Sequence, residues 1–297
     1  MTEPVQKTLN IRGVELCYFE WGTPDPQNNE SILLLHATGF HARVWNRVVE
    51  CLPNRHIIAL EFRGHGRSGK QGPYNWNSFG LDVIDFLDVL QLENMVGVGH
   101  SLGGRVLVHV AAKRPGCFSR LVLVDPVIFD TQSYQIRQES QETINPEDLP
   151  TARRRNQWTG WQEMYERFVD RAPFNTWRKN ILEDYCRYGL APVCNGEGFE
   201  LACPPLVEAE IYATNSSEDV TDSLGEIEVP VAVLRAQPRI GDNSARSDFS
   251  KSPTRQDLAQ LFKAGRDVFL PHLTHFIPMQ VPELVAQFVL DGNAAAD

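Results

Sequence analysis

The chain of 297 residues lacks several features that would point to other classes of protein. No apolar run approaches the roughly 20 residues needed to cross a bilayer. The polar residues 1–7 contain no apolar segment of the kind found in a secretory signal. Positive charge is scarce, with 28 Lys and Arg against 38 Asp and Glu, and the net charge of −10 argues against nucleic acid or a membrane surface as the main partner. We therefore expect a globular, cytoplasmic protein.

Cysteine is also scarce, and its spacing does not indicate a metal site. The six cysteines include no Cys-x-x-Cys pair, so zinc is not expected. Reduced thiols are the default expectation, although Cys186, Cys194 and Cys203 lie close enough in sequence to leave one disulfide open. The pattern Gly-x-x-x-x-Gly-Lys is missing as well, which weakens any phosphate-binding interpretation of the glycines at residues 64–66.

The sequence does contain a strand, a sharp turn and a helix at residues 95–111. A short apolar run at 95–98 is followed by Gly-His-Ser-Leu-Gly at 99–103, after which apolar residues recur at helical spacing. In this context Gly-x-Ser-x-Gly predicts a nucleophile elbow, which holds Ser101 in a strained turn above the sheet edge. The dipole and free N–H groups of the following helix would favour a negative charge developing at Ser101.

Strand and helix patterns alternate along much of the chain. Strands are predicted at residues 5–21 (an antiparallel pair), 32–35, 56–60, 95–98, 121–124, 230–234 and 267–270. Amphipathic spacing predicts helices between them, for example at 77–91. This order predicts a parallel sheet covered by helices on both faces. The alternation stops between residues 127 and 228, where helical patterns occur without a convincing strand.

The segment 99–104 resembles the α/β-hydrolase superfamily, and two further segments extend the resemblance over nearly the whole chain. Residues 61–68 resemble a family loop that normally begins with aspartate, and His275 with its trailing Phe-x-Pro resembles the family's histidine loop. The resemblance implies an α/β fold with a mostly parallel eight-stranded sheet flanked by helices, and a helical cap inserted after the sixth strand. The expected core is residues 1–126 and 229–297, and the expected cap is residues 127–228.

A serine hydroxyl becomes a good nucleophile only when a base accepts its proton. The family order of serine, acid and histidine points to His275 as the base, with His272 as a nearby competitor. The family also stabilises the oxyanion with two backbone N–H groups, which the resemblance assigns to Leu102 and Thr38. Alanine at position 37 replaces the family's glycine, which would strain the loop if that position needed a positive φ.

The acid that would orient the histidine is the least certain member of the site. The family acid usually follows the seventh strand, but residues 236–241 contain no carboxylate. Asp125 ends the sixth strand, where some family members place their acid, whereas Asp242 and Asp248 lie in the polar loop after the seventh. A strand end holds a carboxylate more rigidly than such a loop, so we favour Asp125. It is also open that Asp125 merely caps a turn.

The predicted cap is rich in aromatic residues, which could line an apolar pocket or simply form the cap's own core. Candidate substrate contacts are Trp158 and Trp161 in the cap, with His36 and His100 in the core. The arginines at 153–155 fit a solvated helix face better than a site for an anionic substrate.

Together these features predict a serine hydrolase that cleaves small ester-like substrates through an acyl-enzyme, with no metal or organic cofactor. The same three catalytic residues would also serve hydrolysis of lactones, thioesters or C–C bonds. Two further alternatives remain open: cofactor-independent lyase or perhydrolase chemistry, and a small-molecule receptor whose turnover is incidental.

Overall fold

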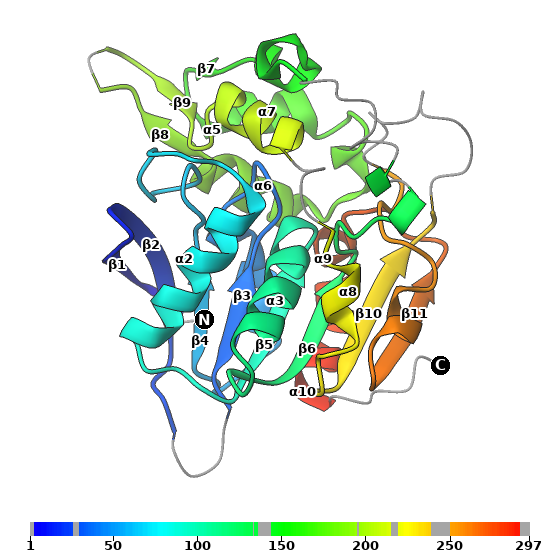
Figure 1. Ribbon diagram of the computed structural model, residues 1–297. Helices are drawn as coiled ribbons and strands as arrows, with labels where there is room; N and C mark the ends of the chain where they lie inside the picture. Colours follow the sequence, from blue (N-terminus) through cyan, green and yellow to red (C-terminus); the bar gives the residue numbers. More distant parts are fainter. Residues whose placement is uncertain are drawn as a thin grey trace.

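The computed structural model describes residues 3–25, 30–132, 134–135, 144–194, 196–214, 219–238 and 250–291. Its largest element is an eight-stranded sheet in the order β1-β2-β4-β3-β5-β6-β10-β11 (Figure 1). The strands are β1 (Val5–Ile11), β2 (Val14–Trp21), β3 (Ile32–Leu35), β4 (Ile57–Leu60), β5 (Met95–His100), β6 (Phe118–Val124), β10 (Val231–Ala236) and β11 (Gly265–Leu270). Neighbours from β4 to β11 are parallel, whereas β2 pairs antiparallel with both β1 and β4. The predicted core strands and the antiparallel edge are therefore confirmed.

The central strands are buried on both faces of the sheet. Ile32 and Leu34 of β3 belong to one apolar cluster, and Leu33 and Leu35 belong to the cluster on the opposite face. A strand covered on both sides needs apolar residues at every position, which explains the continuous run in the sequence.

Helices complete the two outer layers of the molecule. They are α1 (Asn46–Glu50), α2 (Trp76–Val89), α3 (Leu102–Lys113), α5 (Trp161–Phe168), α6 (Lys179–Tyr188), α7 (Pro205–Thr214), α8 (Thr221–Leu224), α9 (Ile277–Gln280) and α10 (Pro282–Asp291), with short 3₁₀ turns at Ala42–Trp45, Pro146–Asp148, Pro150–Arg153, Phe174–Thr176 and Leu258–Leu261. α2, α3 and α8 cover one face of the sheet (Figure 1). α1 and α10 pack together on the other face. Within the described residues, no helix has the length and apolar character that a membrane crossing would need.

The chain between β6 and β10 is called here the inserted segment (residues 127–228). Its helices α5, α6 and α7 lie across one end of the sheet, whereas α8 lies on the face of the sheet beside α3 (Figure 1). The inserted segment contains α5, α6, α7 and α8, together with a small antiparallel sheet of β7 (Gln157–Trp158), β9 (Phe199–Leu201) and β8 (Leu190–Pro192). The prediction of a region without strands is wrong at these three places. A strand of two or three residues is too short to show the alternation on which the prediction depends.

Candidate active site

A single residue forms the turn between β5 and α3. β5 ends at His100 and α3 begins at Leu102, so Ser101 alone reverses the chain, with φ 56° and ψ −113°. Few residues other than glycine adopt a positive φ. A Cβ at Gly99 would lie 2.4 Å from the carbonyl carbon of Gly103, and a Cβ at Gly103 would lie 2.2 Å from the Leu35 carbonyl oxygen. The two glycines therefore let strand and helix approach closely enough for a turn of one residue.

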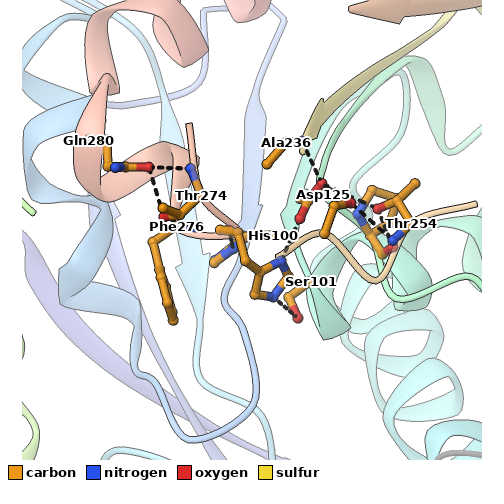
Figure 2. A network of polar contacts seen from close by, with 11 residues as sticks. His100, Ser101, Asp125, Ala236, Thr254, Thr274, Phe276 and Gln280 are labelled. Atoms are coloured by element: carbon orange, nitrogen blue, oxygen red, sulfur yellow. Dashed lines mark hydrogen bonds and ion pairs between the residues drawn. The ribbon is translucent and has the colours of Figure 1, made fainter. Parts of the chain in front are cut away.

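Three side chains from distant parts of the sequence meet beside this turn (Figure 2). His275 Nε2 lies 3.0 Å from Ser101 Oγ, and His275 Nδ1 lies 2.6 Å from Asp125 Oδ2. Ser101, His275 and Asp125 are only 6%, 7% and 0% exposed. A carboxylate beside Nδ1 fixes the proton there, so Nε2 presents a lone pair to the serine hydroxyl.

Asp125 follows β6 directly and lies beside the end of β10. Its Oδ1 accepts hydrogen bonds from the Ala236 N–H at 2.9 Å and from the Ser252 hydroxyl at 2.6 Å. Its own backbone N–H donates to the Leu234 carbonyl at 2.7 Å, with φ at 46°. Among the acids left open by the sequence, Asp125 is thus the one found at His275, while Asp242 and Asp248 lie outside the described residues.

The loop that carries His275 is anchored on two sides. The His275 N–H donates to the Ser250 carbonyl at 3.1 Å, and both the N–H and the hydroxyl of Thr274 donate to Gln280 Oε1 at 2.9 Å (Figure 2). The competing histidine, His272, has no hydrogen bond to Ser101 or Asp125 within the described part of the chain. The ring of His275 is therefore held from its backbone as well as from Asp125.

The two backbone N–H groups expected to bind an oxyanion belong to the start of α3 and to the loop after β3. Leu102 is the first residue of α3, where a helix leaves its N–H groups without an internal partner. Within the described residues, neither the Leu102 nor the Thr38 N–H donates to another protein group. The left-handed residue of the loop is Gly39, with φ 77°, whereas Ala37 has no positive φ. Alanine at position 37 therefore introduces no backbone strain of the kind considered from the sequence.

His36 is occupied in holding this loop. Its Nδ1 lies 2.8 Å from the Ala37 carbonyl, and its Nε2 accepts a hydrogen bond from the Phe62 N–H at 3.2 Å. Burial lowers the pKa of His36 to about 4, so the ring is neutral and donates from Nδ1. His65 has the equivalent arrangement, accepting from the Gly39 N–H and facing the Arg63 carbonyl. Both nitrogens of His36 are engaged by the protein, which leaves none for a substrate.

His100 lies next to the candidate site, with its ring 5.0 Å from that of His275. Its Nε2 is 2.8 Å from the His275 carbonyl, and burial holds its pKa well below the ordinary value. Trp158 and Trp161 lie elsewhere in the inserted segment. Trp158 packs on Phe168 at 5.7 Å, and the Arg187 guanidinium lies 4.7 Å over the Trp161 ring. No ring contact between described residues joins either tryptophan to Ser101 or His275.

A different set of aromatic residues adjoins the candidate site. Phe40 follows the loop after β3, and Phe276 follows His275; their rings lie 6.2 Å apart. Trp177 of the inserted segment lies 5.7 Å from Phe40 and 5.0 Å from Phe276. Phe40 and Phe276 were not among the candidate residues from the sequence, although each stands within two residues of a predicted site residue. That adjacency was the available signal.

Arg154 differs from the solvated helix face expected for residues 153–155. It forms an ion pair with Glu208 of α7, lies 3.3 Å from the Tyr185 hydroxyl and is only 28% exposed. The Glu208 carboxylate in turn packs on the loop after β3, because a Cβ at Gly39 would lie 2.6 Å from Glu208 Oε1. Arg153 and Arg155 are exposed, as expected.

The thiols show no cross-links. All six cysteines are free, including the three that left one disulfide open. Burial raises the pKa of Cys17 and Cys186 to about 12 and that of Cys117 to about 11. No group of three His, Cys, Asp or Glu side chains among the described residues is placed to hold a metal ion.

Comparison with known proteins identifies the family. The family model described as "Alpha/beta hydrolase family" matches residues 32–288. The chain is 36% identical over 103 residues to lipase LipV of Mycobacterium tuberculosis, a match that covers 35% of this chain and only 40% of LipV. It is 26% identical over 233 residues to 3-oxoadipate enol-lactonase 2 of Acinetobacter baylyi, covering 76% and 77% of the two proteins. The solved structure of E-2-(acetamidomethylene)succinate hydrolase is similar, with a TM-score of 0.73 at 19% identity, covering 96% of this chain and 97% of that chain. At that identity the similarity supports the fold alone. The chain belongs to the alpha/beta hydrolase family.

Proposed function

We propose that this chain is a serine hydrolase that cleaves small carboxylic esters through an acyl-enzyme. The observation that carries the proposal is the hydrogen-bonded line from Asp125 through His275 to Ser101, which ends at the first turn of α3. A serine, a base and an acid in this order supply the groups needed to activate a hydroxyl at neutral pH.

In the proposed reaction, Ser101 Oγ attacks the ester carbonyl while its proton passes to His275 Nε2. Asp125 stabilises the resulting imidazolium, and the N–H groups of Leu102 and Thr38 donate to the oxyanion. The tetrahedral intermediate then collapses, and the leaving alcohol takes the proton from His275. In the second half of the reaction, water attacks the acyl-enzyme while His275 again accepts a proton. The carboxylic acid product then leaves as that proton returns to Ser101 Oγ.

The inserted segment acts in this proposal as a cap that selects the substrate. The proposed catalytic groups all come from residues 1–126 and 229–297, so the segment is not needed for the chemistry. Its Trp177 meets Phe40 and Phe276, which lie one or two residues from Thr38 and His275. These rings favour an apolar acyl or alcohol group next to the reacting carbonyl.

A lactone is the second candidate substrate. The similarity to an enol-lactonase over 76% of this chain favours it, and lactone opening differs from ester hydrolysis only because the leaving alcohol stays attached to the acyl group. The same groups of Ser101 and His275 would serve both reactions.

A substrate panel tests the proposal. Wild type and Ser101→Ala would be assayed on p-nitrophenyl esters of rising chain length, with lactones and thioesters alongside. We expect turnover well above the buffer rate in wild type and its loss in the variant. Turnover that survives in Ser101→Ala would mean another nucleophile, and tight binding with negligible turnover would mean a receptor.

A further inference from the structure

Polar groups from the end of β10 and from the segment that follows it hold the carboxylate of Asp125. Its Oδ1 lies near the N–H of Ala236, the last residue of β10, and near the hydroxyls of Ser252 and, at 3.4 Å, Thr254. Ser252 and Thr254 are both buried. Residues 236–241, in which the sequence lacks the family's usual carboxylate, begin with one of these donors, Ala236, and the two hydroxyls lie further along the chain.

The hydrogen-bond directions separate the two hydroxyls. Thr254 Oγ1 lies 2.7 Å from the Pro126 carbonyl, which takes its single proton. Ser252 Oγ accepts a hydrogen bond from the Thr254 N–H at 3.1 Å, so its own proton is left for Asp125 Oδ1 at 2.6 Å. Ser252 is thus the hydroxyl that donates to the carboxylate, and Thr254 supports it from behind.

Ser252 is itself fixed by the backbone. Its N–H donates to the Gln237 carbonyl at 2.9 Å, and Ser252 forms an isolated parallel bridge with Pro238. Two residues earlier, the Ser250 carbonyl accepts the His275 N–H. The short stretch 250–254 therefore contacts the acid and the base together.

We infer that Ser252 is a positioning residue, which holds the Asp125 carboxylate so that Oδ2 faces His275. The inference rests on the proposed function. An aspartate side chain turns readily about its last bond, whose energy profile is broad and two-fold. Two donors on Oδ1, from Ser252 and Ala236, stop that rotation and leave Oδ2 to orient the imidazole. Residues that orient the ligands of a metal typically change affinity or activity by about 10- to 100-fold, and we expect an effect of the same order here.

The test is a double-mutant cycle on a p-nitrophenyl ester. Ser252→Ala should lower kcat by about 10- to 100-fold and leave KM within about twofold, since no contact with substrate is lost. Ser252→Thr, which keeps the hydroxyl, should recover most of kcat. Thr254→Val is the comparison variant: it keeps the N–H that donates to Ser252 Oγ and removes a hydroxyl whose proton goes to Pro126, so it should lower kcat clearly less than Ser252→Ala does.

Coupling to the acid decides the outcome. In an Asp125→Asn background, Ser252→Ala should have almost no further effect on kcat, because Ser252 acts through that carboxylate. An unchanged kcat in Ser252→Ala, or an undiminished effect in the Asp125→Asn background, would overturn the inference alone. A fully active Asp125→Asn would overturn the assigned acid and the inference with it. If Ser252→Ala did not fold, Ser252→Cys, which has nearly the same shape and only a weak donor, would take its place in the cycle.

Discussion

The described part of the chain contains two hydrogen-bonded groups of serine, histidine and carboxylate, at opposite ends of the sheet. Ser101, Asp125 and their histidine lie where β5 and β6 end. The second group lies where β3 and β4 begin: Ser31 Oγ is 2.7 Å from His56 Nδ1, and His56 Nε2 is 2.9 Å from Glu20 Oε1. The hydrogen bonds have nearly the same lengths in both groups, yet only the first has the surroundings of a nucleophile.

The difference lies in what adjoins the serine. Ser101 precedes α3, so the N–H groups and dipole of a helix face it, and its strained turn projects the side chain. Ser31 precedes a strand, and its carbonyl is bonded to the Val96 N–H. Glu20 is also shared with the Lys7 ammonium. Serine, histidine and carboxylate at hydrogen-bonding distance are therefore not sufficient, because a developing oxyanion needs donors aimed at it.

The largest expected effect comes from removing the hydroxyl of Ser101, with the same change at Ser31 as its control. Ser101→Ala should lower kcat by about 10⁴- to 10⁶-fold, as loss of the nucleophile does in characterised serine hydrolases. Ser31→Ala should stay within about twofold of wild type. A sulfonyl fluoride or organophosphonate should add one adduct, which mass spectrometry should locate on the peptide containing Ser101. An adduct on Ser31 would erase the distinction between the two groups.

Removing the charge of each acid should separate the groups further. Asp125→Asn should lower kcat by about 10³- to 10⁴-fold, because the imidazole loses the partner that fixes its tautomer. Glu20→Gln should leave kcat essentially unchanged. Steady-state kinetics of both variants, with circular dichroism to verify the fold, measures the contrast. A mild Asp125→Asn beside a crippled variant at Asp242 or Asp248 would move the acid into the loop after β10.

The histidines should differ in turnover rather than in stability. Both ring nitrogens of the buried His56 are bonded, so His56→Ala should lower the free energy of unfolding by about 1–3 kcal/mol without slowing turnover. The ring of His275 is also buried and bonded at both nitrogens, so His275→Ala should cost a similar amount of stability but should abolish turnover. Urea unfolding and kinetics on the same samples measure both. If the His56→Ala variant were fully folded but turned over substrate slowly, the second group would have a role in the reaction.

The smallest effect is expected at Lys7. Its side chain is 45% exposed, so Lys7→Met should change stability by about 0–1 kcal/mol. Burial alone would raise the pKa of Glu20, but its hydrogen bonds to Lys7 and His56 outweigh burial and hold the pKa below its ordinary value. A lowered carboxyl pKa stabilises the fold above the ordinary value near 4, and that contribution is lost as pH falls through the lowered pKa. The difference in free energy of unfolding between Lys7→Met and wild type should therefore vanish in urea titrations at low pH and in high salt. A difference that persists under those conditions would mean that packing of the Lys7 side chain, not its charge, contributes the stability.

Much of the core could be predicted because its signals are local. β3 and β4 are buried on both faces, and their sequences are unbroken apolar runs. The turn at Ser101 is predicted by the five consecutive residues 99–103. β7, β8 and β9 could not be predicted, because they are shorter than the pattern that identifies a strand. The catalytic roles of Ser101, His275 and Asp125 stay predictions.

Contacts between distant segments explain the other differences. Ser252 lies 127 positions from Asp125, and only the adjacency of β6 and β10 brings them together. The solvated environment expected for Arg154 is wrong because Glu208, far along the chain, pairs with it. No local sequence pattern marks an aspartate that faces a histidine. The prediction of Asp125 as the acid therefore depended on the missing carboxylate at residues 236–241 and on the rigidity of a strand end.

Ser101 and Asp125 have positive φ angles of 56° and 46°. This backbone conformation lowers the stability of the fold at the two positions on which the proposed activity depends. A side chain in this region costs on the order of 1 kcal/mol, less for aspartate than for serine. Glycine at position 101 would relax the turn and should raise the melting temperature while removing the reactive hydroxyl. Directed evolution for thermal stability alone would therefore be drawn towards an inert protein, and any screen that improves this fold must keep turnover as a second criterion.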